Sequence, residues 1–278
     1  MNHTLAPESL DIIPTSKCNL NCSMCWGPFH YIDDKISTKQ WKEILRFFKK
    51  NGTKKIIFTG GEPLLRDDII EIMAFSKKLG YTTTLSTNTL LLKNKEEIIK
   101  YVDQIGIPID GSNKNKNNII RRGNPDQFDT ALEALKSVKK INPKIQVTVR
   151  TVVSALNKDD LVKINSLLES YKYYFDRWKL YQFTPVNYGE INEKNLFITN
   201  ANFNSVCEKI ISLSKIKKIK IYPKIKRLKK YVFIGSNGDV YGVGENGNYQ
   251  KVANVLEDNL NTVLNNIPLV YNKNSKRD

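Results

Sequence analysis

The sequence predicts an α/β protein assembled from repeated strand–helix units. Between Ser9 and Pro185, six short runs rich in apolar and β-branched residues alternate with segments whose apolar residues recur at helical spacing. Such alternation favours a parallel sheet, because each helix returns the chain to the edge where the previous strand began. The 278 residues, 40% of them hydrophobic, suffice for one large domain of this class with a modest extension.

Each predicted strand is a short run of Val, Ile, Leu, Thr or aromatic residues. The six strands are Ser9–Thr15, Lys54–Thr59, Tyr81–Ser86, Gln104–Asp110, Gln146–Val153 and Arg177–Pro185. A capping box of Ser37 with Gln40 begins the first helix, and Gly80 ends the second. Three further helices are predicted at 95–102, 126–141 and 157–170, and the polar run Asn113–Asn118 is predicted to be a mobile loop.

The strand–helix pattern weakens after Pro185. A helix is predicted from about Ala201 to Ile216, followed by a strand at Ile219–Tyr222 and a hairpin that turns at 236–238. The last residues, 271–278, are expected to fray. We therefore divide the chain into a core, residues 1–185, and a C-terminal α+β extension, residues 186–278.

Three of the four cysteines, Cys18, Cys22 and Cys25, lie within eight residues. In a chain without a secretory signal, thiols grouped in this way indicate a metal site rather than disulfides. A structural zinc site would need a fourth ligand. A [4Fe–4S] cluster takes one cysteine per iron, so three cysteines would leave one iron open. A zinc loop and a coincidental group of cysteines are the alternatives.

The CxxxCxxC motif, followed by the aromatic Trp26 and placed after the first predicted strand, resembles the signature of the radical S-adenosylmethionine (radical SAM) superfamily. A second motif, Gly60-Gly61-Glu62-Pro63, follows the second strand and strengthens the resemblance. The resemblance implies a partial (βα)6 TIM-like barrel in residues 1–185, closed by the extension. It also implies a [4Fe–4S] cluster on the three cysteines, with S-adenosylmethionine chelating the open iron.

The same resemblance implies a set of cofactor contacts, and no catalytic side chain beyond them is assigned. Gly60, Gly61, Glu62 and Pro63 would contact the amino group, Ser86 and Asn88 the ribose, and Trp26 the adenine. Arg122 is the preferred partner of the carboxylate. Arg150, which alternation along its strand should point inward, is the second candidate. Ser112 would replace a serine that Pro108 has displaced. Asp110 and Gln182 also follow strands, and ligand-binding residues of such barrels gather at the carboxyl ends of strands.

A weaker similarity points to the substrate. The run Arg177–Gln182 and the pair Arg122-Gly123 resemble viperin-like nucleotide dehydratases, which act on ribonucleoside triphosphates. The segments after the fourth strand and within the fifth instead resemble peptide-modifying radical SAM enzymes. We predict a ribonucleoside triphosphate, with a peptide or another small metabolite as the alternative. The Lys-rich stretch Ile219–Tyr231 is the candidate phosphate-binding wall, or alternatively a solvated basic surface.

The net charge of +16 indicates an anionic partner, although a general excess of Lys in the sequence would produce it equally well. Candidate partners are the small-molecule substrate, possibly a nucleotide, and an acidic electron donor such as flavodoxin or ferredoxin. A metal-bound nucleic-acid-binding protein is a distant alternative, because basic residues and aromatics are not interleaved in a stripe.

Other features of the sequence concern the cellular location and the fourth cysteine. No apolar run approaches the ~20 residues of a membrane span, and the first residues are polar, so we expect a cytoplasmic protein. Cys207 is the one cysteine outside the motif and is expected to be a small buried side chain. One further thiol cannot hold a second cluster, so no auxiliary iron–sulfur cluster is expected.

Overall fold

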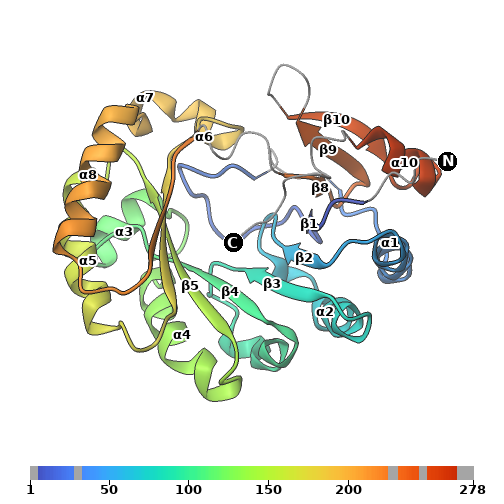
Figure 1. The fold of residues 1–278 in the computed structure, drawn as a ribbon, viewed down its shortest axis with the longest axis horizontal. Coiled ribbons are helices and arrows are strands. Elements are labelled where there is room, and N and C mark those ends of the chain that lie inside the picture. The colour runs from blue at the N-terminus through green and yellow to red at the C-terminus, as the bar shows by residue number, and fades with distance from the viewer. Residues whose placement is uncertain (1–5, 28–32, 225–230, 244–248, 268–278) are drawn as a thin grey trace.

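The computed structural model describes residues 6–27, 33–224, 231–243 and 249–267. Its strands form one curved sheet in the order β10-β9-β8-β1-β2-β3-β4-β5-β6-β7, with helices on the outer face (Figure 1). The strands β1 to β7 are parallel: β1 (Ser9–Ile12), β2 (Lys55–Phe58), β3 (Thr82–Ser86), β4 (Gln104–Pro108), β5 (Gln146–Val153), β6 (Arg177–Gln182) and β7 (Ile219–Tyr222). The sheet is open, as in the predicted partial barrel.

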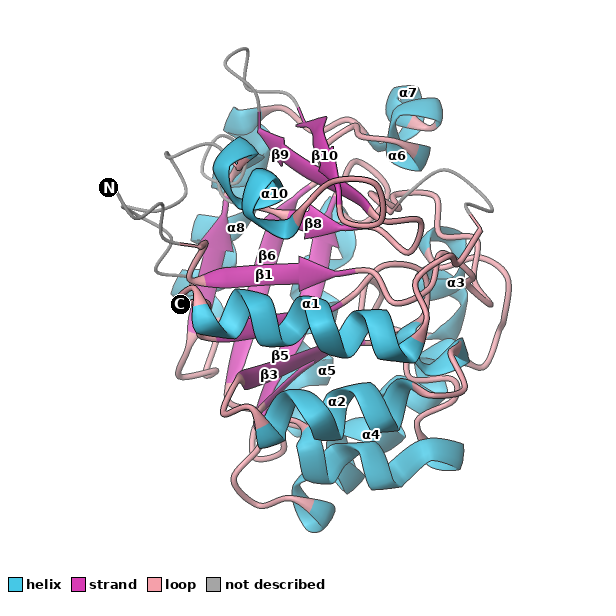
Figure 2. Cartoon of the chain, turned by 90° about the vertical axis from the view of Figure 1, so that its right-hand side faces the viewer, coloured by secondary structure: helices cyan, strands magenta, loops and turns pink. Residues whose placement is uncertain are grey.

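The helices succeed one another around the outer face, and α1 and α2 cross it side by side in both views (Figure 1 and Figure 2). They are α1 (Thr38–Lys50), α2 (Ile69–Lys78), α3 (Lys114–Ile120), α4 (Gln127–Ile141), α5 (Leu161–Ser170), α6 (Tyr188–Ile191), α7 (Glu193–Leu196), α8 (Asn200–Leu213) and α10 (Leu260–Asn266). Short 3₁₀ helices occupy Pro63–Leu65, Lys93–Tyr101 and Lys158–Asp160. The predicted capping box of Ser37 with Gln40 is present at α1.

The C-terminal segment adds strands at both ends of the parallel sheet. β7 pairs with β6, whereas β8 (Phe233–Ile234) pairs in parallel with β1. β9 (Asp239–Val243) and β10 (Tyr249–Asn254) then continue antiparallel, and the predicted hairpin turn contains Gly238 at φ +93°. The boundary predicted at residue 185 falls between β6 and α6, and the sheet runs across it; the division into two domains stays a prediction. Residues 271–278 lie outside the described part.

The core lies between the sheet and the helices. Side chains alternate along each strand, so one set packs on the helices and the other faces the concave side. Val149 and Thr151 of β5 are fully buried in the helix-facing layer, as are Trp178 and Leu180 of β6. Residues between them in the sequence therefore face the concave side of the sheet, where a ligand would bind.

One predicted loop is wrong. Residues 114–120, which belong largely to the polar run 113–118, form α3. Asn113 begins this helix by accepting a hydrogen bond from Lys116 N, and Ile120 is buried at its end. Asn117 is also fully buried, where its side chain accepts from Asp110 N and donates to Gln127. These tertiary contacts outweigh the polar composition that predicted a loop.

Candidate active site

The cysteine loop joins β1 to α1. Cys18 is exposed, whereas Cys22 and Cys25 are half-buried. Each sulfur has one N–H group directed at it: Leu20 N at 3.4 Å from Cys18, Arg121 Nη1 at 3.8 Å from Cys22 and Gly27 N at 3.3 Å from Cys25. Donors placed in this way stabilise the thiolate form that binds metal.

Gly60 and Gly61 bring the end of β2 against the cysteine loop. A Cβ on Gly61 would lie 2.1 Å from Lys17 O, and one on Gly60, which has φ +115°, would lie 2.4 Å from Ile13 Cγ2. Glu62 N donates to Lys17 O at 2.8 Å. The two glycines are therefore required for packing between the motifs, in addition to any approach to a ligand.

The Glu62 carboxylate ties the ends of β2 and β3 together. It is buried and accepts hydrogen bonds from Leu64 N at 3.1 Å, Thr87 Oγ1 at 2.8 Å and Asn88 N at 2.6 Å. Burial raises the pKa of Glu62 to about 7, although the backbone donors oppose this change. The Asn88 side chain continues the connection by donating to Asn19 Oδ1 in the cysteine loop at 2.6 Å.

Arg66 holds both ends of the cysteine loop. Its Nη1 donates to Pro14 O at 2.8 Å and its Nη2 to Ile36 O at 3.0 Å. Asp68 orients the guanidinium through Nε at 2.5 Å and Nη2 at 3.0 Å. One side chain thus joins the residues that precede and follow all three cysteines.

The C-terminal extension meets the loop at Trp26. The indole is 42% exposed and its centroid lies 5.0 Å from the ring of Phe233 in β8. Asn187 Nδ2 donates to Trp26 O at 2.7 Å, and Gly189 N donates to Cys25 O at 2.9 Å. The exposed indole face is available to a ligand, and its contact with adenine stays a prediction.

Arg121, which the sequence analysis did not single out, lies closer to the site chemistry than Arg122. Arg121 pairs with the fully buried Asp110 at 2.5 Å and points at Cys22. The Arg122 side chain is exposed, and its carbonyl accepts a hydrogen bond from Asn21 N at 2.7 Å. Asp110, predicted to contact the cofactor, thus has a basic partner within the protein.

Arg150 lies on the concave face, as predicted from alternation along its strand. Its Nη1 donates to Ser86 Oγ at 2.6 Å, and Gly106 leaves the space that the guanidinium occupies. Its Nε is buried and has no hydrogen-bond partner within the described residues. A buried donor of this kind costs free energy unless a ligand or water binds it.

Lys179 and Lys220 lie beside Arg150 on the next two strands and form a row of basic residues across the sheet. Arg150 is in register with Lys179, and Lys179 with Lys220, so the three side chains share the concave face. Burial, and then the Arg150 charge, lowers the pKa of Lys179 to about 7. Alternation with the buried Trp178 could have revealed Lys179 from the sequence.

Two predicted cofactor contacts have their polar atoms bonded within the protein. Ser112 donates to Asp160 through its N at 2.7 Å and its Oγ at 2.8 Å. Gln182 is buried, donates to Asn200 Oδ1 at 2.8 Å and accepts from Lys224 N at 2.9 Å. Their roles toward the cofactor stay predictions, and these bonds show what each side chain does for the fold.

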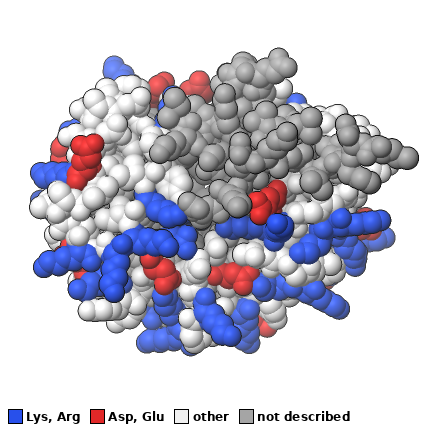
Figure 3. Space-filling model, in the orientation of Figure 1, with Lys and Arg blue, Asp and Glu red and all other residues white. Residues whose placement is uncertain are grey.

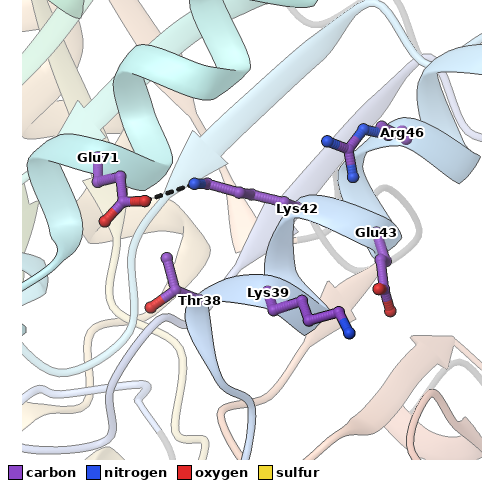
Figure 4. Close-up of a pocket in the computed structure, with 6 residues that line it drawn as sticks. All are labelled: Thr38, Lys39, Lys42, Glu43, Arg46 and Glu71. Atoms are coloured by element: carbon purple, nitrogen blue, oxygen red, sulfur yellow. Dashed lines mark hydrogen bonds and ion pairs between the residues drawn. The ribbon is translucent and has the colours of Figure 1, made fainter.

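Two surface hollows are lined by residues that lie outside the cysteine motif in the sequence. One, of about 420 Å³, lies between α1 and α2 on the outer side of the molecule and is crossed by the Lys42–Glu71 ion pair (Figure 4). The other, of about 290 Å³, borders Gln182, Asn200 and Lys224 where β6 ends. Only the second adjoins the edge of the sheet that carries the site.

The cysteine loop fits a [4Fe–4S] cluster. Within the described ranges, no three Cys, His, Asp or Glu side chains converge closely enough to hold a single metal ion. A cluster sets a different requirement, because each cysteine binds a separate iron atom. Burial raises the pKa of the Cys22 thiol to about 11, so binding of the cluster would displace a proton. Cys18, Cys22 and Cys25 would hold three irons and leave the fourth open.

An open parallel barrel with three cysteines and a glycine-rich turn at one edge is the arrangement expected of an iron–sulfur enzyme built on a partial TIM barrel. A family model described as the radical SAM superfamily matches residues 12–168, more than half of the sequence. The chain therefore belongs to the radical SAM superfamily, whose members use a [4Fe–4S] cluster and S-adenosylmethionine. The predicted family, fold and cofactors are confirmed.

Two relatives have the same name, which describes an activity. A chain from Selenomonas ruminantium named S-adenosylmethionine-dependent nucleotide dehydratase is 26% identical over 260 residues, covering 90% of this chain and 91% of the relative. A chain of the same name from Flammeovirga pacifica is 26% identical over 272 residues, covering 92% and 89%. The alignments thus extend well beyond the superfamily core.

A solved structure confirms the fold. Streptococcus suis SuiB bound to precursor peptide SuiA superposes with a TM-score of 0.76 at 19% identity, covering 98% of this chain and 67% of SuiB. The similarity includes the C-terminal strands, since nearly the whole chain is matched. Among the described residues, no helix is long and apolar enough to cross a membrane.

Proposed function

We propose that this enzyme uses radical SAM chemistry to remove a hydrogen atom from a ribonucleoside triphosphate, as a nucleotide dehydratase. Cys18, Cys22 and Cys25 would hold the cluster, which when bound would supply the electron for reductive cleavage of S-adenosylmethionine and thus the radical that abstracts the hydrogen. The protein binds and orients the two molecules and keeps water away from the radical. The observation that carries the proposal is the row of cations on the concave face.

Arg150, Lys179 and Lys220 provide adjacent positive charges from three neighbouring strands. The Arg150 charge helps to lower the Lys179 pKa, and a bound polyanion would relieve this repulsion. A triphosphate supplies such a charge, and the ammonium groups of Lys179 and Lys220 would bind its oxygen atoms. A neutral peptide backbone offers no anionic group to these side chains.

Aromatic rings flank the row of cations. Tyr181 and Tyr222 stack with centroids 4.9 Å apart, and Lys179 Nζ lies 5.0 Å from the Tyr222 centroid. Aromatic faces of this kind suit a nucleobase or ribose. Lys220 and Tyr222 belong to the Lys-rich stretch 219–231 predicted to bind phosphate; residues 225–230 of that stretch lie outside the described part.

The two dehydratase relatives support the nucleotide substrate, since each covers about nine tenths of this chain. The likeness to SuiB extends to the fold alone, and a peptide or another small metabolite is the alternative substrate. We also propose an acidic flavodoxin or ferredoxin as the electron donor and a reducing, cytoplasmic setting, because an open iron–sulfur cluster is sensitive to oxygen.

The substrate is tested with the anaerobically reconstituted full chain. Reduced enzyme is incubated with S-adenosylmethionine and each of the four ribonucleoside triphosphates, and 5′-deoxyadenosine is quantified. We expect one triphosphate to raise 5′-deoxyadenosine formation at least roughly tenfold above the substrate-free reaction, since a bound substrate captures the radical. The matching deoxynucleotide and nucleoside are the controls. If no triphosphate stimulates cleavage while the substrate-free reaction proceeds, the nucleotide assignment is wrong and the peptide alternative gains.

We further propose that Arg150 or Arg122 pairs with the S-adenosylmethionine carboxylate, and the unpaired Arg150 Nε supports Arg150. Separate Arg150→Ala and Arg122→Ala variants are titrated with S-adenosylmethionine by calorimetry. Removal of the pairing residue should weaken binding roughly 10- to 100-fold, the usual cost of one charged hydrogen bond. Parent-like affinity in both variants would exclude the two arginines together.

A further inference from the structure

Asp110 and Arg121 form an ion pair directly beside Cys22. Arg121 Nε donates to Asp110 Oδ2 at 2.5 Å, and Arg121 Nη1 lies 3.8 Å from Cys22 Sγ. The Asp110 side chain is fully buried and the Arg121 side chain is only 13% exposed. Charges this far from water are costly to bury unless their geometry is well supported.

The backbone supplies that support. Gly111 allows α3 to pack closely against the end of β4, because a Cβ at this position would lie 2.2 Å from Asn117 N. Asp110 Oδ1 accepts from Val152 N at 2.7 Å, which leaves Oδ2 for the guanidinium. Arg121 ends α3, and its N–H donates to Asn117 O at 2.8 Å. Both members of the pair are therefore fixed in place by neighbouring elements.

Cys22 extends the pair into a row of three alternating charges when it binds iron as a thiolate. Hydrogen bonds and positive charge near a cluster sulfur raise the reduction potential, because the reduced cluster carries one more negative charge. Arg121 would act in this direction. Asp110 orients the guanidinium and partly cancels its charge, so it would act in the opposite direction.

We propose that the Asp110–Arg121 pair sets the reduction potential of the cluster through Cys22. Arg121 donates to the Cys22 sulfur and stabilises the reduced state, while Asp110 positions Arg121 and limits its effect. The inference concerns the cluster and is independent of the nucleotide substrate, so either proposal can fail alone. The proposal predicts that removal of the Arg121 charge and removal of the Asp110 charge shift the reduction potential in opposite directions.

The test uses the full chain reconstituted anaerobically with iron and sulfide, without substrate. The cluster is titrated with dithionite in the presence of redox mediators, and electron paramagnetic resonance follows the reduced form. We expect Arg121→Gln to decrease the ratio of reduced to oxidised cluster about tenfold at fixed potential, which is about 59 mV for a one-electron couple. Asp110→Asn should increase this ratio, because its amide oxygen can still accept from Arg121 Nε while the negative charge is removed. Lys116→Gln removes an exposed charge from α3 and should leave the titration unchanged.

Iron content and thermal unfolding are measured for every variant. Should Arg121→Gln fail to retain iron, Arg121→Lys provides the test, because it keeps the charge without the planar fork and should stay within about threefold of the parent ratio. Unchanged titrations at full iron content overturn the proposal, as do shifts of Arg121→Gln and Asp110→Asn in the same direction. A parent-like potential with weakened S-adenosylmethionine binding also overturns it and makes Arg121 a cofactor contact.

Discussion

The protonation state of Lys179 should depend on whether an anionic substrate is bound. Burial, and then its cationic neighbours, lowers the pKa of the ammonium group to about 7. A bound polyanion favours the charged form and raises this pKa again. Below pH 7 the residue is already charged, whereas above pH 7 binding must take up a proton. Proton uptake and affinity are therefore linked at Lys179.

We expect the affinity for a ribonucleoside triphosphate to fall as the pH rises from 7 to 9. The loss should approach roughly tenfold per pH unit, the limit for one linked proton. Lys179→Arg should flatten this dependence, because the guanidinium keeps its charge throughout the range. Calorimetric titrations in two buffers with different ionisation enthalpies measure both the affinity and the proton uptake.

Lys179→Gln removes the charge and should weaken binding roughly tenfold at pH 6.5, without proton uptake at pH 8. Lys39→Gln is the matched control, because Lys39 is exposed on the outer hollow between α1 and α2 (Figure 4). A pH dependence that persists unchanged in Lys179→Gln would assign the linked proton to another group.

The cysteine and glycine motifs of the site could be predicted from the sequence, whereas the positions of its charged side chains were predicted less well. The spacing of Cys18, Cys22 and Cys25 and the glycine-rich turn are local patterns, so they identified the family directly. Arg121 was missed because its orientation depends on where α3 ends, and that helix was predicted as a loop. A one-residue difference between Arg121 and Arg122 decides which guanidinium is buried.

At the scale of elements, strands were predicted well and the connections less well. All six predicted strands exist within a few residues of their predicted bounds, because β-branched runs carry their own signal. The loop predicted at 113–118 is wrong because Asn117 is buried by contacts with Asp110, which follows β4, and with Gln127 of α4. No local pattern reveals these contacts. The helix predicted at 95–102 is present as the 3₁₀ helix Lys93–Tyr101.

Contacts at the carboxyl ends of the strands also link neighbouring elements to one another. Arg66 joins both ends of the cysteine loop, and Glu62 joins the ends of β2 and β3. Gly61 packs against Lys17 O with no room for a side chain. The glycine-rich turn therefore shapes the loop that carries the cysteines, a structural role that the sequence motif alone did not reveal.

At the scale of the whole molecule, the extension completes the sheet on both sides. β7 supplies Lys220 beside Lys179, and β8 supplies Phe233 beside Trp26. The extension thus contributes a side chain to the cationic row and another to the surroundings of the cysteine loop. The sequence predicted its helix and hairpin, whereas the pairing of β8 with β1 depends on contacts between distant segments.

On the described surface seen in Figure 3, Lys and Arg side chains cover more area than Asp and Glu side chains. With a net charge of +16, the molecule attracts anionic partners over about one Debye length, ~8 Å at physiological salt. An acidic electron donor would be steered toward it, whereas a small cationic reductant would be repelled. The two kinds of reductant should therefore respond to salt in opposite ways.

We expect the rate of cluster reduction by an acidic flavodoxin to fall as the salt concentration rises from 0.05 to 0.5 M, by roughly tenfold or more. Reduction by the methyl viologen radical cation should stay constant or increase over the same range, because salt screens its repulsion. Anaerobic stopped-flow absorbance measures both rates on the reconstituted enzyme. A fall of equal size with both reductants would mean that salt acts on the enzyme itself, and it would exclude electrostatic steering of the donor as the cause.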